Sequence, residues 1–289
     1  MTKNIMIFGP TASGKTALAI KLAQQHDAVI INGDSRQLYK YMPILTAMPS
    51  EEEFSQAPHY LYDFLEPEEK FSAVDYLERV KDTLNLPEVK NKTVIISGGT
   101  GMYLKVILEG ISPVPKISDG VVKLLTMRAE NEGIETLYDE LLEVDSELAH
   151  QLPSTDTQRI IRGLSVYEET GMPLSEYQKI PPSGGLEMEF HKIAINPDRE
   201  ELYQRINQRF TQMLENGLLG EISKLKDQGY KVDCPGLSSL GVKELYAHLD
   251  GELTLEQASE KICQQTRRYA KRQLTWLRGH YHADELVGD

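Results

Sequence analysis

A glycine-rich octapeptide near the N-terminus, GPTASGKT at 9–16, limits the possible folds more than any other feature of this sequence. It fits the pattern G-x-x-x-x-G-K-[ST] at every defined position. It also lies between an apolar run at 5–8 and a stretch of helical composition at 15–25. In such a strand–turn–helix context, backbone N–H groups and a helix N-terminus converge on phosphate oxygens. The motif therefore predicts a phosphate-binding loop on an α/β sheet.

The loop residues have expected roles in holding a diphosphate. Lys15 would supply a positive charge, and the hydroxyl of Thr16 would suit magnesium, the cofactor that we expect. The predicted donor-binding residues are Gly9, Pro10, Thr11, Ala12, Ser13, Gly14, Lys15 and Thr16. A chance glycine-rich turn is the alternative. The motif alone leaves the diphosphate unidentified, because most such loops hold ATP or GTP.

Further apolar runs extend the alternation of strand and helix. Residues 28–31 and 93–96 have the composition of buried strands, and 191–195 that of a returning strand. Such β-α-β alternation predicts a P-loop NTPase-like parallel sheet with helices on both faces. Ligands of such sheets bind at the carboxyl ends of the strands.

The middle of the chain has a different pattern. Strand-like runs are scarce between about Gly110 and Gly185, whereas 121–131, 134–143 and 157–170 look helical. We therefore predict a catalytic core at 1–112 and 188–289, with a helical insertion at 113–187. Within the core, 198–217 and 254–278 are predicted helices, both with the residue spacing of a capping box.

Charge and composition restrict the class of protein. The formal net charge of −13 taken alone argues against a nucleic-acid binder. A polyanion site would have to be local, and 261–278 holds six Lys or Arg and no acidic residue. Two distant cysteines, Cys234 and Cys263, indicate neither a disulfide framework nor a zinc site and fit a reduced cytosolic compartment. No apolar run has the length of a membrane span or signal peptide.

Two motifs directly follow predicted strands. DSRQLY at 34–39 places Asp34 where a carboxylate could hold magnesium through water or accept a proton from a substrate. A turn or helix cap is the alternative role for Asp34. In GGTGMY at 98–103, three glycines around Thr100 would bring the backbone close to a ligand, unless they form a plain strand-to-helix turn.

Basic residues recur on three predicted helices. Arg205 and Arg209 share one helix face, which suggests a nearby anion, although pairing with Glu201 is the alternative.

On 254–278, Arg267, Lys271 and Arg278 fall within about 40°, with Arg268 and Arg272 beside them, an arc suited to a phosphate backbone. A merely solvated face is the alternative, and Trp276 fits the core better than a base-stacking role. Gln158, Arg159 and Arg162 bring amide and guanidinium groups together that could read bases or phosphates.

In combination, these motifs resemble the tRNA dimethylallyltransferase family over nearly the whole chain. The resemblance is carried, in family order, by GPTASGKT, DSRQLY, HYLYD at 59–63, GGTGMY, DTQRIIR at 156–162, DREELYQRINQRF at 198–210 and TRRYAKRQLTWLR at 266–278. Two stretches depart from the family pattern: 45–49 lacks a Gly and a Lys, and 239–244 reads SLGVKE.

The resemblance implies that dimethylallyl diphosphate is the donor and that the acceptor is the exocyclic amine of the adenine 3′ of the anticodon. Asp34 would be the general base, with Lys15, Thr16, Thr100, Arg205 and Arg209 as further catalytic residues. The implied contacts to the anticodon stem-loop are Asp34, Ser35, Arg36, Gln37, Thr100, Lys123, Gln158, Arg159, Ile160, Ile161, Arg162, Arg267, Lys271 and Arg272. We expect a cytoplasmic monomer that does not bind membranes.

Three other functions share part of this pattern. A P-loop kinase of a nucleotide or small metabolite would share 9–16 and magnesium, but it does not predict GGTGMY or the basic last helix. Prenyl transfer to a free adenine nucleotide would need neither the insertion nor that helix. A P-loop regulator that binds RNA without catalysis is the third, although the sequence has no NKxD motif for guanine.

Overall fold

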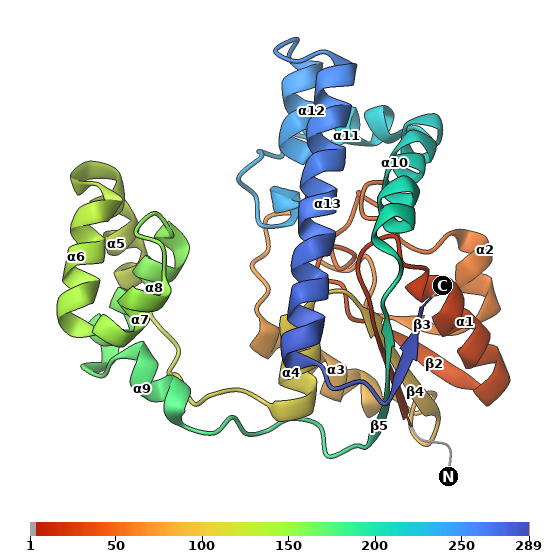
Figure 1. Cartoon of the computed structure of the whole chain (residues 1–289), viewed down its shortest axis with the longest axis horizontal. Coiled ribbons are helices and arrows are strands. Elements are labelled where there is room, and N and C mark those ends of the chain that lie inside the picture. Colours follow the sequence, from red (N-terminus) through yellow and green to blue (C-terminus); the bar gives the residue numbers. More distant parts are fainter. Residues whose placement is uncertain (1–3, 289) are drawn as a thin grey trace. The chain divides into compact units, whose positions relative to one another are not determined.

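The computed structural model describes residues 4–288 and places six parallel strands in one sheet (Figure 1). The strands are β1 (Asn4–Phe8), β2 (Ala28–Asn32), β3 (His59–Tyr60), β4 (Thr93–Gly98), β5 (Phe190–Ile195) and β6 (Glu285–Val287). Their order across the sheet is β3-β2-β4-β1-β5-β6, and each pairing of these strands is parallel. The predicted parallel α/β sheet is confirmed.

The sheet is apolar on both faces because helices cover both. Alternate strand residues point to opposite faces. Ile7 and Ile30 share one cluster of buried side chains with Ile20 of α1 (Lys15–His26). On the other face, the ring of Phe8 lies 5.0 Å from that of Trp276. Strands buried on both faces have unbroken apolar runs, which is why 5–8, 28–31 and 93–96 were recognisable in the sequence.

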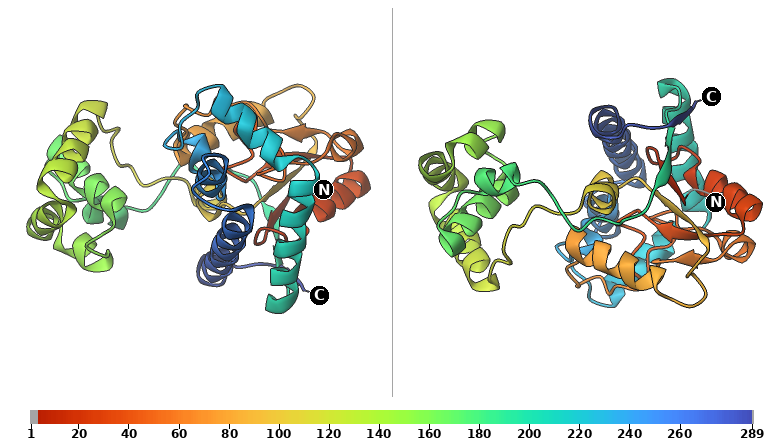
Figure 2. Two further views of the ribbon diagram at one scale, coloured as in Figure 1. Left: turned by 90° about the horizontal axis from the view of Figure 1, so that it is seen from above. Right: turned by 90° about the horizontal axis from the view of Figure 1, so that it is seen from below.

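The remaining helices of the core are α2 (Glu51–Gln56), α3 (Ala73–Leu84), α4 (Gly101–Glu109), α10 (Arg199–Glu215), α11 (Leu218–Asp227), η1 (Gly236–Ser238), α12 (Val242–Leu249) and α13 (Leu255–His280) (Figures 1 and 2). The two predicted long helices begin where expected. Thr254 and Gln257 form the capping box of α13, and the Asp198 carboxylate accepts hydrogen bonds from the first amides of α10. The two edge strands β3 and β6 were not predicted, because they are short and carry no apolar run.

The carboxyl ends of β2 and β4 approach each other closely. The Gly33 amide donates to the Ser97 carbonyl oxygen at 2.8 Å, and the Thr100 amide donates to the Gly33 carbonyl at 3.3 Å. A Cβ atom at Gly98 would lie 2.0 Å from the Gly33 carbonyl oxygen, so a side chain there would force the two turns apart. The glycines of GGTGMY therefore bring backbone close to backbone and place Thr100 beside the turn that carries Asp34.

The helical insertion, Glu109–Gly185, is a compact unit separate from the core, and the predicted boundaries at 113 and 187 fall close to its ends. It contains α5 (Asp119–Glu132), α6 (Ile134–Val144), α7 (Ser146–Gln151), α8 (Thr157–Thr170) and α9 (Leu174–Lys179). Leu137, Leu141 and Ile160 are completely buried in its apolar centre. The carboxylate of Asp145 accepts amide hydrogen bonds from Leu148 and Ser175, which ties α7 to α9.

Among residues 4–288, no helix combines the length and the apolar character that crossing a membrane requires.

Candidate active site

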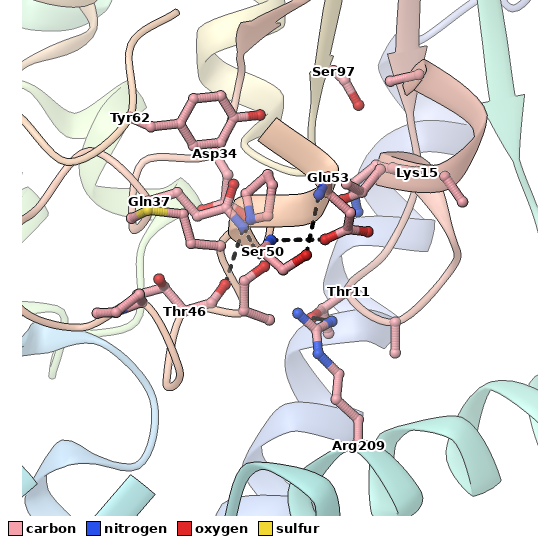
Figure 3. A pocket seen from close by; sticks show the side chains of 18 of the residues that line it. Thr11, Lys15, Asp34, Gln37, Thr46, Ser50, Glu53, Tyr62, Ser97 and Arg209 are labelled. Carbon is pink, nitrogen blue, oxygen red and sulfur yellow. Dashed lines mark hydrogen bonds between the residues drawn. The ribbon is translucent and has the colours of Figure 1, made fainter. Parts of the chain in front are cut away.

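Two cavities meet beside Asp34 at the carboxyl ends of the strands. The larger, of about 990 Å³, is lined by the loop 11–17, by the segment 43–51 and by side chains of α2 and α10 (Figure 3). The smaller, of about 300 Å³, is lined by residues of α10 and α13. Both contain Thr11, Ala12, Asp34, Thr46, Arg209 and Met213 in their walls. Asp34 and Arg209 thus lie where two ligands could meet.

The glycine-rich loop at 9–16, predicted to bind phosphate, has two residues with left-handed backbone conformations. Ala12 and Gly14 adopt positive φ angles of 62° and 87°, which turn successive amides to one side of the loop. The buried hydroxyl of Ser13 has no hydrogen-bond partner among the described residues. This hydroxyl lies against Gly9, where a Cβ atom would be 2.7 Å from it, so a side chain at position 9 would disturb the loop.

Lys15 lies at the base of the larger cavity. Its ammonium donates to the carbonyl oxygen of Pro10 at 2.8 Å. Burial lowers the pKa of Lys15 to about 8, against the attraction of Asp34 and with a further contribution from the charge of Arg209. An anion bound in this cavity would therefore stabilise the charged form of Lys15.

The Asp34 turn is held by a buried amide that the sequence analysis missed. Asn32, fully buried at the end of β2, donates through Nδ2 to the carbonyl oxygens of Asp34 (3.0 Å) and Leu61 (2.9 Å). Its Oδ1 accepts from the Asp34 amide at 2.8 Å. The signal for Asn32 in the sequence was a polar residue at the end of a fully buried strand. Asn32 fixes the backbone from which the Asp34 carboxylate projects.

Asp34 has the turn-capping role that the sequence left open, and its side chain also faces both cavities. Its Oδ1 accepts a hydrogen bond from the Arg36 amide at 2.9 Å, so the carboxylate does cap a turn. The same side chain also lines both cavities. The turn uses one carboxylate oxygen, and the group still faces the space that a ligand would occupy.

The neighbours of Asp34 hold one another in place. The Ser35 amide donates to Thr100 Oγ1 at 2.9 Å. Arg36 Nη1 donates to the Pro235 carbonyl oxygen and to Ser238 Oγ, at 3.1 and 2.7 Å. Gln37 Nε2 donates to the carbonyl oxygens of Thr46 and Ala47 (Figure 3). Ser35 and Arg36 line the smaller cavity and Gln37 the larger.

The two arginines of α10 differ in environment. Arg209 lines both cavities, donates to Thr11 Oγ1 at 3.4 Å and has its pKa lowered by burial. Arg205 lines the larger cavity but also pairs with Glu201 at 3.2 Å. Pairing with Glu201, the alternative considered for both residues, therefore holds for Arg205, while Arg209 is the better-placed anion ligand.

The basic residues of α13 have different contacts. Arg267 packs over the ring of Tyr203 and donates to Asn207 Oδ1 at 2.9 Å, so it binds α10. Arg272 lies over the ring of Tyr269 and lines the smaller cavity, whereas Lys271 is exposed. Binding of a phosphate backbone by these residues stays a prediction, and Arg267 has contacts on α10 in the free protein.

A buried glutamine of α13 was also missed. Gln273 accepts the Thr11 amide at 2.9 Å and donates to the Gly99 carbonyl oxygen at 2.8 Å. A polar residue on the buried side of the helix was the signal. Gln273 thereby joins the phosphate loop to the GGTGMY turn. Trp276 is half-buried against Phe8, in agreement with its predicted place in the core.

In the insertion, the predicted RNA-contacting residues divide between core and surface. Ile160 and Ile161 are 0% and 8% exposed in the apolar centre of this unit, so their side chains support α8 rather than contact RNA. This corrects the prediction for both residues. Gln158, Arg159 and Arg162 on the same helix are exposed, as is Lys123 on α5.

The family model for IPP transferases matches residues 37–280. The chain belongs to the IPP transferase family. It is 40% identical over 277 residues to the tRNA dimethylallyltransferase of Geobacter sulfurreducens, covering 96% of this chain and 89% of the relative. It is 41% identical to the tRNA dimethylallyltransferase of Bartonella henselae, covering 98% and 97% of the two chains.

Solved structures of family members share the fold. The tRNA isopentenylpyrophosphate transferase of Bacillus halodurans has a TM-score of 0.69 and 32% identity, over 100% of this chain and 90% of that one. A eukaryotic dimethylallyltransferase captured acting on tRNA has a TM-score of 0.80 and 27% identity, over 100% and 74%. Both likenesses extend over the whole chain, the core and the insertion included.

Proposed function

We propose that this chain transfers a dimethylallyl group from dimethylallyl diphosphate to the exocyclic amine of the adenine 3′ of the anticodon in tRNA. The observation that carries the proposal is the pair of cavities that meet at Asp34 and Arg209. One cavity has a phosphate loop, and the other is lined by α13 with its aromatic and basic side chains. Such a pair suits two substrates that react at one carboxylate.

The donor occupies the larger cavity with its diphosphate on the phosphate loop. As the bond between the first prenyl carbon and the diphosphate oxygen breaks, negative charge grows on the leaving group. The loop amides, Lys15 and Arg209 stabilise that charge where it develops. Arg205 adds a weaker contribution because Glu201 already pairs with it.

The acceptor adenine enters the smaller cavity. A base stacked in the anticodon loop must leave the stack to do so, at a cost of roughly a few kcal/mol. The amine nitrogen forms the new bond to carbon and loses a proton, which the Asp34 carboxylate accepts. Thr100 and Asn32 keep that carboxylate in position through the turn. Arg36 and Arg272 are the cations beside this cavity that would contact RNA phosphates.

The residues present fit magnesium. The Thr16 hydroxyl lines the larger cavity beside Lys15, where the diphosphate is proposed to bind, and hydroxyl, phosphate and water oxygens are ligands of the kind that magnesium prefers. Bound there through Thr16, magnesium would neutralise part of the diphosphate charge. ATP binding, which phosphate loops commonly provide, is not required by this proposal.

The insertion binds the anticodon stem-loop through the exposed face of α8, with Gln158, Arg159 and Arg162, and through Lys123 of α5. We further propose that the protein acts as a monomer in the cytoplasm. The compact apolar centre of the insertion supports its role as a rigid RNA-binding unit.

One experiment tests the proposal directly. Protein, magnesium, labelled dimethylallyl diphosphate and unmodified tRNA are incubated, and the label is located by nuclease digestion. We expect the label on the adenine 3′ of the anticodon. Label transfer from ATP with no transfer from the prenyl donor would instead identify a kinase, and label on free adenine nucleotide alone would identify the smaller acceptor.

A further inference from the structure

The loop 43–49 forms a wall shared by the two cavities. Ile44 and Ala47 line the larger cavity, Leu45 lines the smaller one, and Thr46 lines both. The loop is a series of turns, and Ala47 has a φ of 48° in the left-handed region that residues with a side chain rarely adopt. Such a conformation persists only where surrounding contacts determine it.

Glu221, on the first turn of α11, provides contacts at the start of this loop. Its Oε2 accepts the Ile44 amide at 2.8 Å and its Oε1 accepts the Leu45 amide at 2.9 Å. Both oxygens of one carboxylate thus bind successive loop amides, and hydrogen bonds to a charged acceptor are stronger than neutral ones.

The position of Glu221 on its helix supports a dedicated role. Leu218, Ile222 and Leu225 are completely buried, and Glu221 falls in the same stripe, where helical spacing favours an apolar residue. Burial raises the pKa of its carboxyl, so the charge is held there at a cost. A carboxylate in this stripe is explained by the amides that it binds.

Gln37 holds the other end of the loop. Its Nε2 donates to the carbonyl oxygens of Thr46 and Ala47 at 3.1 and 2.9 Å (Figure 3). The loop is therefore clamped by an acceptor at its start and a donor at its end. Because Gln37 belongs to the turn that carries Asp34, the clamp connects the wall of the cavities to that carboxylate.

We propose that Glu221 is a positioning residue for prenyl transfer, which holds loop 43–49 so that donor and acceptor are both aligned at Asp34. Glu221 lines neither cavity, and it acts through the loop that it binds. The inference rests on the proposed function and adds a residue that none of the motifs contains.

The test uses Glu221→Gln, which keeps the side-chain size but removes the charge and one acceptor oxygen. We expect kcat/KM to fall roughly 10- to 100-fold, because small misplacements of reacting groups have effects of this size. The KM values for donor and for tRNA should rise together, since the loop lines both cavities. Amide hydrogen exchange at Ile44 and Leu45 should accelerate about tenfold or more.

Asp227→Asn is the matched control, because Asp227 is an exposed carboxylate on the same helix. It should leave exchange and kinetics unchanged. If Glu221→Gln fails to fold, Gln37→Met removes both donors at the opposite end without altering α11. It should accelerate exchange at Ala47 and Met48 and raise both KM values.

Two results would overturn the proposal. One is unchanged exchange at Ile44 and Leu45 in Glu221→Gln. The other is accelerated exchange with kcat/KM and both KM values unchanged. A wild-type protein that transfers no prenyl group would refute the proposed function instead. The exchange measurement would then still decide whether Glu221 holds the loop.

Discussion

The core and the insertion both contain polar side chains that the sequence marks as candidate ligands of RNA or phosphate. The two units differ in how the fold arranges these side chains. In the core, Lys15, Asp34 and Thr100 come from segments that follow three different strands, and sheet topology brings them together. In the insertion, Gln158 to Arg162 occupy one helix, and helical periodicity separates them. Residues from distant segments meet where strand ends share one edge of the sheet. Residues of one helix face the apolar centre or the solvent according to their position within a helical turn.

The strongest test of the core is Asp34→Asn. Asparagine keeps an oxygen to accept the Arg36 amide, so the turn should persist while the base is lost. We expect turnover to fall about 10²- to 10⁴-fold, the usual contribution of general base catalysis, with tRNA affinity unchanged. Single-turnover rates and filter binding measure the two quantities. Turnover close to wild type would remove Asp34 as the base.

A pair of substitutions on α8 tests the division between core and surface in the insertion. Ile160→Ala should lower the stability of this unit by about 2–5 kcal/mol, because it leaves a cavity in an apolar centre. Arg159→Ala, one residue earlier and exposed, should change the stability by no more than about 0.5 kcal/mol. Amide hydrogen exchange within the insertion compares them. Equal effects would contradict the assignment of Ile160 to structure and of Arg159 to the surface.

Features that depend on local patterns could be predicted from the sequence, whereas those that depend on distant contacts could not. The fold class, the glycine-rich turn at 9–16 and the caps of α10 and α13 depend on local patterns, and the structure has them where they were predicted. The positioning residues Asn32, Gln273 and Glu221 were missed because each bonds to backbone groups far away in the sequence. Their only local signal is a polar side chain at a position that periodicity assigns to the core. Similarly, the hydrogen bond from Arg267 to Asn207 was not predicted, because Asn207 lies on another helix.

A third prediction concerns Lys15 and pH. Burial lowers the pKa of Lys15 to about 8 in the free protein, and a bound diphosphate would raise it. Donor binding is therefore strongest below pH 8, where Lys15 is charged, and weakens as pH rises above that value, by up to about tenfold per pH unit. Donor dissociation constants measured from pH 7 to pH 9 test this. Lys15→Met should weaken binding roughly 10- to 100-fold at pH 7 and remove the Lys15-dependent part of the trend, so an identical pH profile in that variant would contradict the assignment.

The smallest expected effect tests the insertion as an RNA-binding surface. The double variant Arg159→Gln with Arg162→Gln should weaken tRNA binding roughly 5- to 10-fold near physiological salt. A variant that makes fewer phosphate contacts releases fewer counterions when it binds tRNA. The slope of log affinity against log salt concentration should therefore become shallower by about one to two. The KM for the donor should stay constant, since neither residue lines the larger cavity.

Lys21→Gln combined with Lys90→Gln, which removes two exposed positive charges from the core, is the matched control for net charge. If the control weakens tRNA binding as much as the double variant, the effect comes from overall charge and α8 is not a specific contact. If the double variant raises the donor KM as well, the insertion and the donor site are coupled, and the separation of roles between the two units fails. A shallower salt dependence confined to the α8 variant is the outcome that assigns RNA phosphates to this helix.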